Sequence, residues 1–254
     1  MTVRKAWYTM NKISAIVIAG NEESNIRDCL ESVAWADEII VVDSQSVDRT
    51  VEIARRYTPN VHVRAWQGYA NQKAFALQAA SHEWVLSLDA DERVQAKLAE
   101  EIAAADLDAF DGYRIKRENY FLGRRIRGCG WGRDYQVRLF RKSRTTVIDR
   151  PVHEGFKVDG AMGVLAGAIT HYSYRTLKEA FAKIDAYSTL EAEGKARRMS
   201  ANPIAMLGAP LFAFLQHYLV RRGFIDGTYG VMVSLMHAMT KLQVRMKIWE
   251  MRRK

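Results

Sequence analysis

The sequence predicts an α/β protein whose central sheet is mostly parallel and carries helices on both faces. The first observation is a regular alternation of short apolar runs and helix-like segments across residues 13–105. The second is that runs such as ISAIVIA and EIIVVD are apolar at nearly every position, as strands covered on both faces are. The predicted strands span 13–19, 38–43, 61–66 and 84–89, and the predicted helices span 24–33, 48–57, 71–80 and 94–105.

The pattern changes from Gly112 onward. The arginine-rich segments GYRIKRENYFLG and DYQVRLFRK predict antiparallel or mixed strands. After ITHYSY (169–174) the spacing becomes helical, and two apolar segments, 203–224 and 229–249, follow. We therefore expect one domain over residues 1–174 and a helical extension over residues 175–254.

Charge is distributed unevenly along the 254 residues, whose formal net charge is +9. Residues 1–113 hold 11 Lys and Arg against 18 Asp and Glu, whereas residues 114–150 hold 12 against 3. An acidic first half and a basic second half indicate different partners, and anionic lipid, phosphorylated sugar or nucleic acid would each suit the basic part. Two distant cysteines and an N-terminus without an apolar signal core predict a reducing, cytoplasmic location.

Two aspartates, Asp89 and Asp91, close the apolar run WVLSLDAD. Residues two apart in an extended strand point the same way, so both carboxylates can face one site. Their repulsion calls for a cation, and Mg²⁺ or Mn²⁺ completed by substrate phosphate oxygens fits this pair. The alternative is structural: Asp89 ends a strand and Asp91 caps the next helix.

Further polar residues follow the other predicted strands, at the edge where such sheets bind ligands. Glu22 lies in GNEES, and Asp43 and Ser46 lie in DSQSVD. Carboxylates accept hydrogen bonds from ribose hydroxyls and from base N–H groups. Lys73 can offset phosphate charge or be solvated, and Ser46 can also cap a helix. Neither a P-loop nor a G-x-G-x-x-G motif is present.

These motifs, taken in order, resemble the family 2 glycosyltransferases with the GT-A fold. The resemblance rests on AGNEE, EIIVVDSQSVDRT, GYANQKAFALQAA and VLSLDADE. RDYQVRLFRK, RPVHEGF, ITHYSY and RRGFIDGTYG resemble the branch that builds the inner core of lipopolysaccharide, the WaaE-type glucosyltransferases. The resemblance covers about residues 12–250.

The resemblance implies a role for each matching position. Glu22 and Asp43 would contact the uridine of a nucleotide-sugar, Asp89 would contact the nucleotide or ribose, and Asp91 would hold the metal against the diphosphate. His171 can be a further metal ligand, although a lone histidine is more often a partly buried polar residue. The family inverts configuration by direct displacement, with a carboxylate as general base.

The general base must lie near the acceptor hydroxyl. Glu154, in PVHEGF, is the preferred residue, because acidic residues are otherwise sparse in that region; Asp134 is the alternative. Glu154 can instead form a salt bridge with a nearby arginine, and for Asp134 a structural role is the preferred interpretation. His153 is a candidate substrate contact, and Arg138 suits bidentate binding of phosphate or of the acceptor.

The apolar segment 203–224 raises the question of a membrane. Its apolar core is at the short limit for a bilayer span and contains Pro210, Gln216 and His217. We expect an interfacial helix, peripheral on the inner face of the inner membrane, with flanking arginines on anionic headgroups. A buried helix pair or a dimer contact is the alternative.

The prediction is a metal-dependent inverting glycosyltransferase that moves a hexose, glucose from UDP-glucose, onto a lipid-linked lipopolysaccharide core. A nucleotidyltransferase also combines such a sheet with acidic metal ligands, but it needs a glycine-rich phosphate loop, and AGNEES is poor in glycine. A non-enzymatic basic module for membrane or nucleic acid would explain YRIKRENYFLGRRIRGCGW. It would not explain the acidic edge, so no nucleic-acid partner is expected.

Overall fold

The computed structural model describes residues 11–148 and 155–253. The chain forms two compact units. Unit 1 comprises Met1–Arg117 and Tyr135–His171, and unit 2 comprises Glu118–Asp134 and Tyr172–Lys254. Two long strands contribute residues to both units. Each unit is described by itself.

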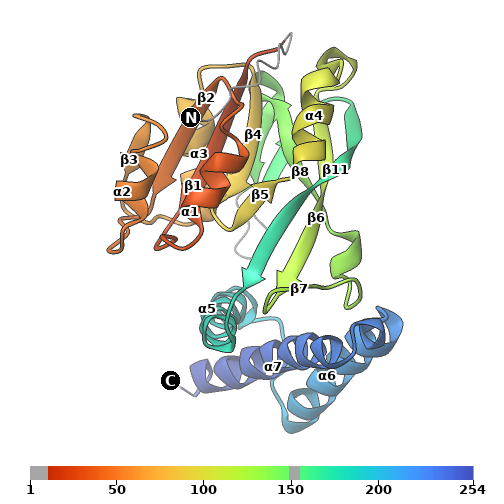
Figure 1. The fold of residues 1–254 in the computed structure, drawn as a ribbon. Coiled ribbons are helices and arrows are strands. Elements are labelled where there is room, and N and C mark those ends of the chain that lie inside the picture. The colour runs from red at the N-terminus through yellow and green to blue at the C-terminus, as the bar shows by residue number, and fades with distance from the viewer. Residues whose placement is uncertain (1–10, 149–154, 254) are drawn as a thin grey trace. The chain divides into compact units, whose positions relative to one another are not determined.

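The first half of the sheet in unit 1 is parallel, as predicted (Figure 1). Its strands follow the order β3-β2-β1-β4. They are β1 (Ile13–Ala19), β2 (Glu38–Asp43), β3 (Val61–Val63) and β4 (Trp84–Asp89). Ala19 pairs with Asp43 and Ile18 with Asp89, so the carboxyl ends of three neighbouring strands lie side by side.

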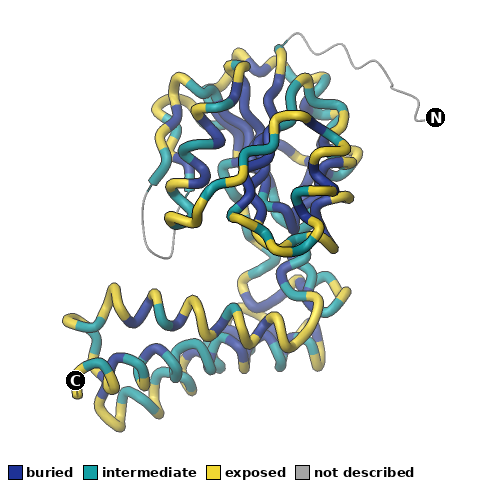
Figure 2. Tube along the Cα trace, turned by 90° about the vertical axis from the view of Figure 1, so that its left-hand side faces the viewer, coloured by how far each residue is buried: buried dark blue, intermediate teal, exposed yellow. Residues whose placement is uncertain are grey.

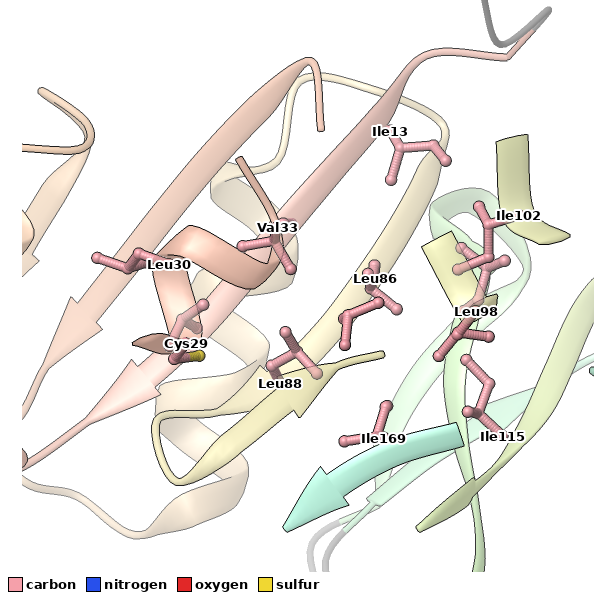
Figure 3. Close-up of a cluster of buried hydrophobic side chains, with 14 of the residues drawn as sticks. Ile13, Cys29, Leu30, Val33, Leu86, Leu88, Leu98, Ile102, Ile115 and Ile169 are labelled. Atoms are coloured by element: carbon pink, nitrogen blue, oxygen red, sulfur yellow. The ribbon is translucent and has the colours of Figure 1, made fainter. Parts of the chain in front are cut away.

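Helices cover both faces of this parallel part. They are α1 (Ile26–Ser32), α2 (Thr50–Ala54), α3 (Tyr69–Ala79) and α4 (Ala96–Ala104). Alternate residues of β1 enter different apolar clusters: Ala15 and Val17 pack with α1, α2 and α4, whereas Ile16 and Ile18 pack with α3. Every residue of β1 is therefore buried, which is why the strand is apolar throughout rather than alternating. Figure 3 shows the first cluster, with Leu30 of α1 and Leu98 of α4 among its labelled side chains.

The second half of the sheet is antiparallel, in agreement with the change of pattern at Gly112. The order continues β4-β8-β6-β11-β5. The strands are β5 (Glu92–Val94), β6 (Gly112–Phe121), β7 (Arg124–Arg125), β8 (Tyr135–Arg141) and β11 (Met162–Tyr174), with β9 (Thr145–Ile148) and β10 (Gly155–Val158) forming a separate pair. Although β5 follows β4 after two residues, it pairs with β11, where His171 lies opposite Glu92.

Unit 2 is built around three helices: α5 (Leu177–Lys195), α6 (Pro203–Leu215) and α7 (Thr228–Met251). Short helical turns, η4 (Gln216–Val220) and η5 (Gly223–Asp226), join α6 to α7, and α6 packs along α7. Asp226 anchors the loop after β7 by accepting hydrogen bonds from the backbone N–H groups of Arg127 (3.1 Å) and Gly128 (2.6 Å). A side chain at Gly128 would meet the backbone carbonyl of Arg222, so glycine is required there.

The two units differ in how many of their large apolar side chains are exposed, and most of the exposed ones belong to unit 2. Figure 2 shows that the strands of unit 1 are largely buried and that the helices of unit 2 carry many exposed positions. A cavity of about 700 Å³ lies between α5, α6 and α7, with Met206, Met246 and Trp249 in its lining. The apolar segments predicted at 203–224 and 229–249 are thus a helical hairpin within unit 2.

Candidate active site

The loops after β1 and β2 are tied together at the carboxyl edge of the parallel strands. The backbone N–H of Asn21 donates to Ser46 Oγ (2.7 Å), and the backbone N–H of Val47 donates to Asn21 Oδ1 (2.9 Å). The backbone N–H of Glu22 donates to Thr50 Oγ1 (2.7 Å). These reciprocal bonds fix two loops that sequence alone shows only as polar clusters.

Asp43 and Ser46 form a local pair within this edge. The Asp43 side chain is buried and accepts from both the backbone N–H (2.8 Å) and the hydroxyl (2.5 Å) of Ser46. Glu22 is half-buried, and its carboxylate accepts from the Asn25 side chain at 2.6 Å. The structure therefore brings Glu22, Asp43 and Ser46 to one edge. Neutral donors, Asn25 and Ser46, orient the carboxylates of Glu22 and Asp43.

Asp89 ends β4 and is held by two cations. Arg138 on β8 donates to its Oδ2 at 2.7 Å, and Lys73 Nζ on α3 lies 3.6 Å from its Oδ1. Burial alone would raise the pKa of Asp89, but the attraction of Arg138 and then Lys73 outweighs it and lowers the pKa. Asp89 is ionised at neutral pH, although its neighbour two residues on is also acidic.

Glu92 is a functional candidate that the sequence analysis did not select. It is fully buried on β5, and its carboxylate accepts from the backbone N–H of Asp89 at 3.0 Å. Its other oxygen lies 2.5 Å from Arg138 and 3.3 Å from Arg117. Glu92 thus fixes the turn between Asp89 and Asp91. The available signal was a charged residue directly after the two aspartates of DADE, together with a lone arginine in QVRLF.

Arg138 is enclosed by these carboxylates. It is buried, and its guanidinium bonds to both Asp89 and Glu92. Burial would lower the pKa of Arg138, but the two carboxylates hold it above its ordinary value. Its contacts are internal to unit 1, which favours a role in positioning Asp89 over the predicted contact with substrate phosphate or acceptor.

Asp91 has different surroundings from Asp89. It is buried, and its Oδ2 lies 3.5 Å from Nε2 of His171 on β11. The alternative that Asp91 caps the following helix is wrong, because β5 intervenes and α4 begins only at Ala96 after the N-cap Gln95. The structure thus brings together the two residues predicted as metal ligands.

A divalent metal fits this pair if substrate completes its coordination. Within residues 11–148 and 155–253, no group of three or more His, Cys, Asp and Glu side chains is arranged to hold a metal ion. Mg²⁺ is commonly bound through one or two carboxylates plus substrate phosphates rather than by an all-protein cage. Asp91 and His171 match the protein's share of such a coordination shell.

Three predicted residues remain, of which the structure describes Asp134 alone. His153 and Glu154 are outside the described residues. Asp134 belongs to unit 2, where its carboxylate accepts from the Asn119 side chain at 3.0 Å. This bond attaches the end of the loop before β8 to Asn119 of β6.

Comparison with known proteins identifies the family. The family model described as Glycosyl transferase family 2 matches residues 14–161. The lipopolysaccharide core biosynthesis glycosyltransferase LpsC of Rhizobium meliloti is 30% identical over 248 residues, covering 89% of this chain and 90% of the relative. An uncharacterized glycosyltransferase of Rickettsia typhi, RT0209, is 30% identical over 257 residues, covering 95% and 88%.

Among solved structures, residues 1–349 of S. aureus TarS align over 95% of this chain and 91% of that one, with 16% identity and a TM-score of 0.48. The family match spans all four parallel strands and both aspartates at the end of β4. The chain belongs to glycosyl transferase family 2, and the protein is a glycosyltransferase.

Proposed function

We propose that the protein transfers a hexose, glucose from UDP-glucose, onto the inner core of lipopolysaccharide, with inversion and with a divalent metal. The observation that carries this proposal is the loop at the carboxyl edge of the parallel strands, where Asp89 is ion-paired within the fold and Asp91 faces His171. Support for the acceptor comes from the relative LpsC, whose name assigns it to lipopolysaccharide core biosynthesis.

The donor nucleotide would bind at the tied loops. Glu22 and Asp43 offer carboxylate oxygens for base N–H groups and ribose hydroxyls, and Ser46 keeps Asp43 oriented. Asp89 lies at the end of the neighbouring strand β4, where it would contact the ribose. Lys73 lies on helix α3, where it would limit the negative charge near the diphosphate. The hydrogen bonds that tie these loops together reduce the ordering needed on binding.

Asp91 and His171 would hold Mg²⁺ or Mn²⁺ in this proposal. When bound, the metal would offset the charge that develops on the departing nucleoside diphosphate. Arg138 and Glu92 would keep the Asp89–Asp91 turn rigid, so that the Asp91 carboxylate stays directed at the site.

Glu154 is the proposed general base. Its carboxylate would take the proton from the acceptor hydroxyl while that oxygen bonds to the anomeric carbon and the diphosphate leaves from the opposite face. Asp134 is less suited, because its carboxylate already accepts from Asn119. His153, next to Glu154 in sequence, is the proposed acceptor contact.

The acceptor is proposed to be lipid-linked, which would place the enzyme at the inner face of the membrane. The basic stretch 114–150 supports a phosphorylated acceptor, because arginines bind phosphate in a bidentate manner. Family membership sets the nucleotidyltransferase alternative aside.

Ligand-dependent thermal stability tests the donor site. We expect UDP with Mn²⁺ to raise the melting temperature more than either alone, because a ligand that binds only the folded state opposes unfolding. Asp91→Asn removes a metal ligand, so it should abolish the gain and reduce transfer by roughly 1,000-fold. Glu100→Gln, an exposed change of the same charge on α4, is the control. A full Mn²⁺-dependent gain in Asp91→Asn would contradict the metal assignment.

The base has a separate test. Glu154→Gln should keep the thermal gain from UDP and Mn²⁺ but reduce transfer by roughly 100-fold or more, because general-base catalysis contributes that much. Asp134→Asn serves as the comparison. Normal transfer by Glu154→Gln, measured with UDP-glucose and a truncated core acceptor, would show that the base lies elsewhere.

A further inference from the structure

The α6 segment leaves most of its apolar side chains in solvent. Only 11% of the residues from Pro203 to Val220 are buried, and among the described residues this is the one helix long and apolar enough to cross a membrane. Ile204 is 81% exposed, Leu207 76% and Leu211 61%. Such a contiguous exposed apolar surface is uncommon on a soluble monomer and marks an interaction site.

The charges within this part of the sequence have one sign, and the acidic residues nearby include Asp185 and Glu250 in the adjacent cavity lining. Residues 194–225 contain no Asp or Glu and five basic residues, which are Lys195, Arg197, Arg198, Arg221 and Arg222. Three precede α6 and two follow η4. Arg252, from the end of α7, bonds to the carbonyl oxygens of Ala196 and Met199 at 2.7 Å, which adds a cation before the start of α6. Both ends of the apolar surface are therefore cationic.

An aromatic side chain accompanies the cations before α6. Trp249 of α7 is 47% exposed and lines the same cavity as Pro203. Arg253 lies over its ring at 4.6 Å. Tryptophan and arginine together are typical of the boundary between headgroups and acyl chains.

The charges on the neighbouring helix α7 limit how far α6 can insert into a bilayer. Helix α7 packs along α6 and carries Lys241 and Lys247, which pair with Glu191 and Asp185 of α5. A hairpin that crossed the bilayer would bring these charges into hydrocarbon, which is costly. The arrangement fits a helix lying in one leaflet, with α7 and α5 on its aqueous side.

We propose that the α6 surface, made of Ile204, Leu207, Leu211 and Phe212 between the two basic ends, inserts into one leaflet of an anionic bilayer. The flanking arginines bind lipid phosphates while the apolar side chains enter the acyl region. A second copy of the chain fits less well, because it would bring the same cations to the same face. The value of this attachment rests on the proposed function, since it brings the active site to a lipid-linked acceptor.

The test uses the full chain and vesicle flotation. Wild-type protein should float with vesicles of phosphatidylcholine and phosphatidylglycerol, and less with phosphatidylcholine alone or at high salt. Leu207→Glu/Leu211→Glu should reduce binding by roughly tenfold or more, because two leucines that would enter the acyl region are replaced by charges. Val164→Glu, at an equally exposed apolar position of β11, is the matched control and should bind as wild type does.

A second variant keeps the test decisive if the double glutamate fails to fold. Arg197→Gln/Arg198→Gln alters two exposed cations and should weaken binding to anionic vesicles roughly tenfold, with a smaller salt effect. Binding of both variants at the wild-type level would overturn the proposal. So would a wild-type dimer that Leu207→Glu/Leu211→Glu converts to a monomer without any vesicle binding.

Transfer to a water-soluble truncated acceptor is measured in parallel. We expect it to be unchanged in both surface variants. If wild-type protein binds vesicles through α6 but transfers no sugar, the proposed function fails and the membrane surface stands. If it transfers sugar but binds no vesicle, the reverse holds.

Discussion

The two units bury ionisable groups in opposite ways. In unit 1, Asp89 stays charged because Arg138 lies 2.7 Å from its carboxylate, and the same guanidinium lies 2.5 Å from Glu92. In unit 2, His217 and His237 stack at 3.7 Å, and the charged groups near them are the cations Arg221 and Lys241. Burial is the main cause that lowers both pKa values. Arg221 adds to it for His217, whose pKa falls to about 4, and His217 and then Arg221 add to it for His237, whose pKa falls to about 3.

The difference is one of purpose: the unit 1 network can hold a charged ligand, whereas the unit 2 histidine pair belongs to a packed interior. The unit 1 network holds fixed charges at the sheet edge, where a charged ligand is proposed to bind. The histidine pair of unit 2 is neutral at pH 7 and serves packing: His217 Nδ1 lies 3.1 Å from the Cys129 carbonyl oxygen. The two regions should therefore fail under different perturbations, the first on loss of a partner and the second on acidification.

Removing the shared cation should have the largest effect on stability. Arg138→Ala leaves Asp89 and Glu92 close together without their main counter-charge, so we expect the free energy of unfolding to fall by about 3 kcal/mol. Chemical denaturation with circular dichroism measures it. Arg49→Ala, which breaks an exposed pair with Glu52, should cost far less, because water screens that pair. Equal losses in the two variants would remove the distinction between the network and a surface pair.

Acidification should act first on unit 2. The folded pKa of each histidine lies below its ordinary value of 6.5, so between pH 6.5 and about 4 the unfolded chain binds more protons and stability falls as pH falls. Protonation of His217 alone should lower the free energy of unfolding by about 3 kcal/mol over this pH range. His237 Nε2 has no hydrogen-bond partner among the described residues, so His237→Phe should fold and show a shallower decline.

The unit 1 network should respond only at lower pH. The folded pKa of Asp89 is lowered, so its contribution is present above its unfolded pKa and is lost as pH falls below about 4. Asp89→Asn should change the profile only in that range. A wild-type profile that is flat from pH 6.5 to 4.5 in thermal unfolding would contradict the account of the histidine pair.

The parts of the fold that follow from local pattern were predictable. The strands at 13–19, 38–43 and 84–89 begin and end as predicted, because both faces are buried and polar residues follow each run. Helix α2 is shorter than the predicted 48–57, since Asp48 accepts from the backbone N–H of Thr50 and α2 begins only at that residue.

Contacts between distant residues could not be read from the sequence. In the sequence, nothing distinguishes Arg138 of QVRLF from a solvated surface arginine. Only the pairing of β8 with β4 brings it to Asp89, 49 positions away. Glu92 reaches Arg138 only because β5 pairs with β11, on the far side of the antiparallel half of the sheet. The motif DADE predicts a site in this loop, but only the strand order shows that its carboxylates have separate partners.

The smallest predicted effect concerns the pair that lies between these two extremes, Asp91 and His171. Here a carboxylate faces a titratable side chain at 3.5 Å rather than a permanent cation. If His171 is a metal ligand as proposed, His171→Asn should weaken Mn²⁺ binding in the presence of UDP by roughly tenfold, because one of two protein ligands becomes weaker. The Mn²⁺ midpoint of the UDP-dependent melting shift measures this. Stability without ligand should change little, and His82→Asn, elsewhere in unit 1, should leave the midpoint unchanged. A midpoint within twofold of wild type would mean that His171 only orients Asp91, and that the metal depends on the carboxylate alone.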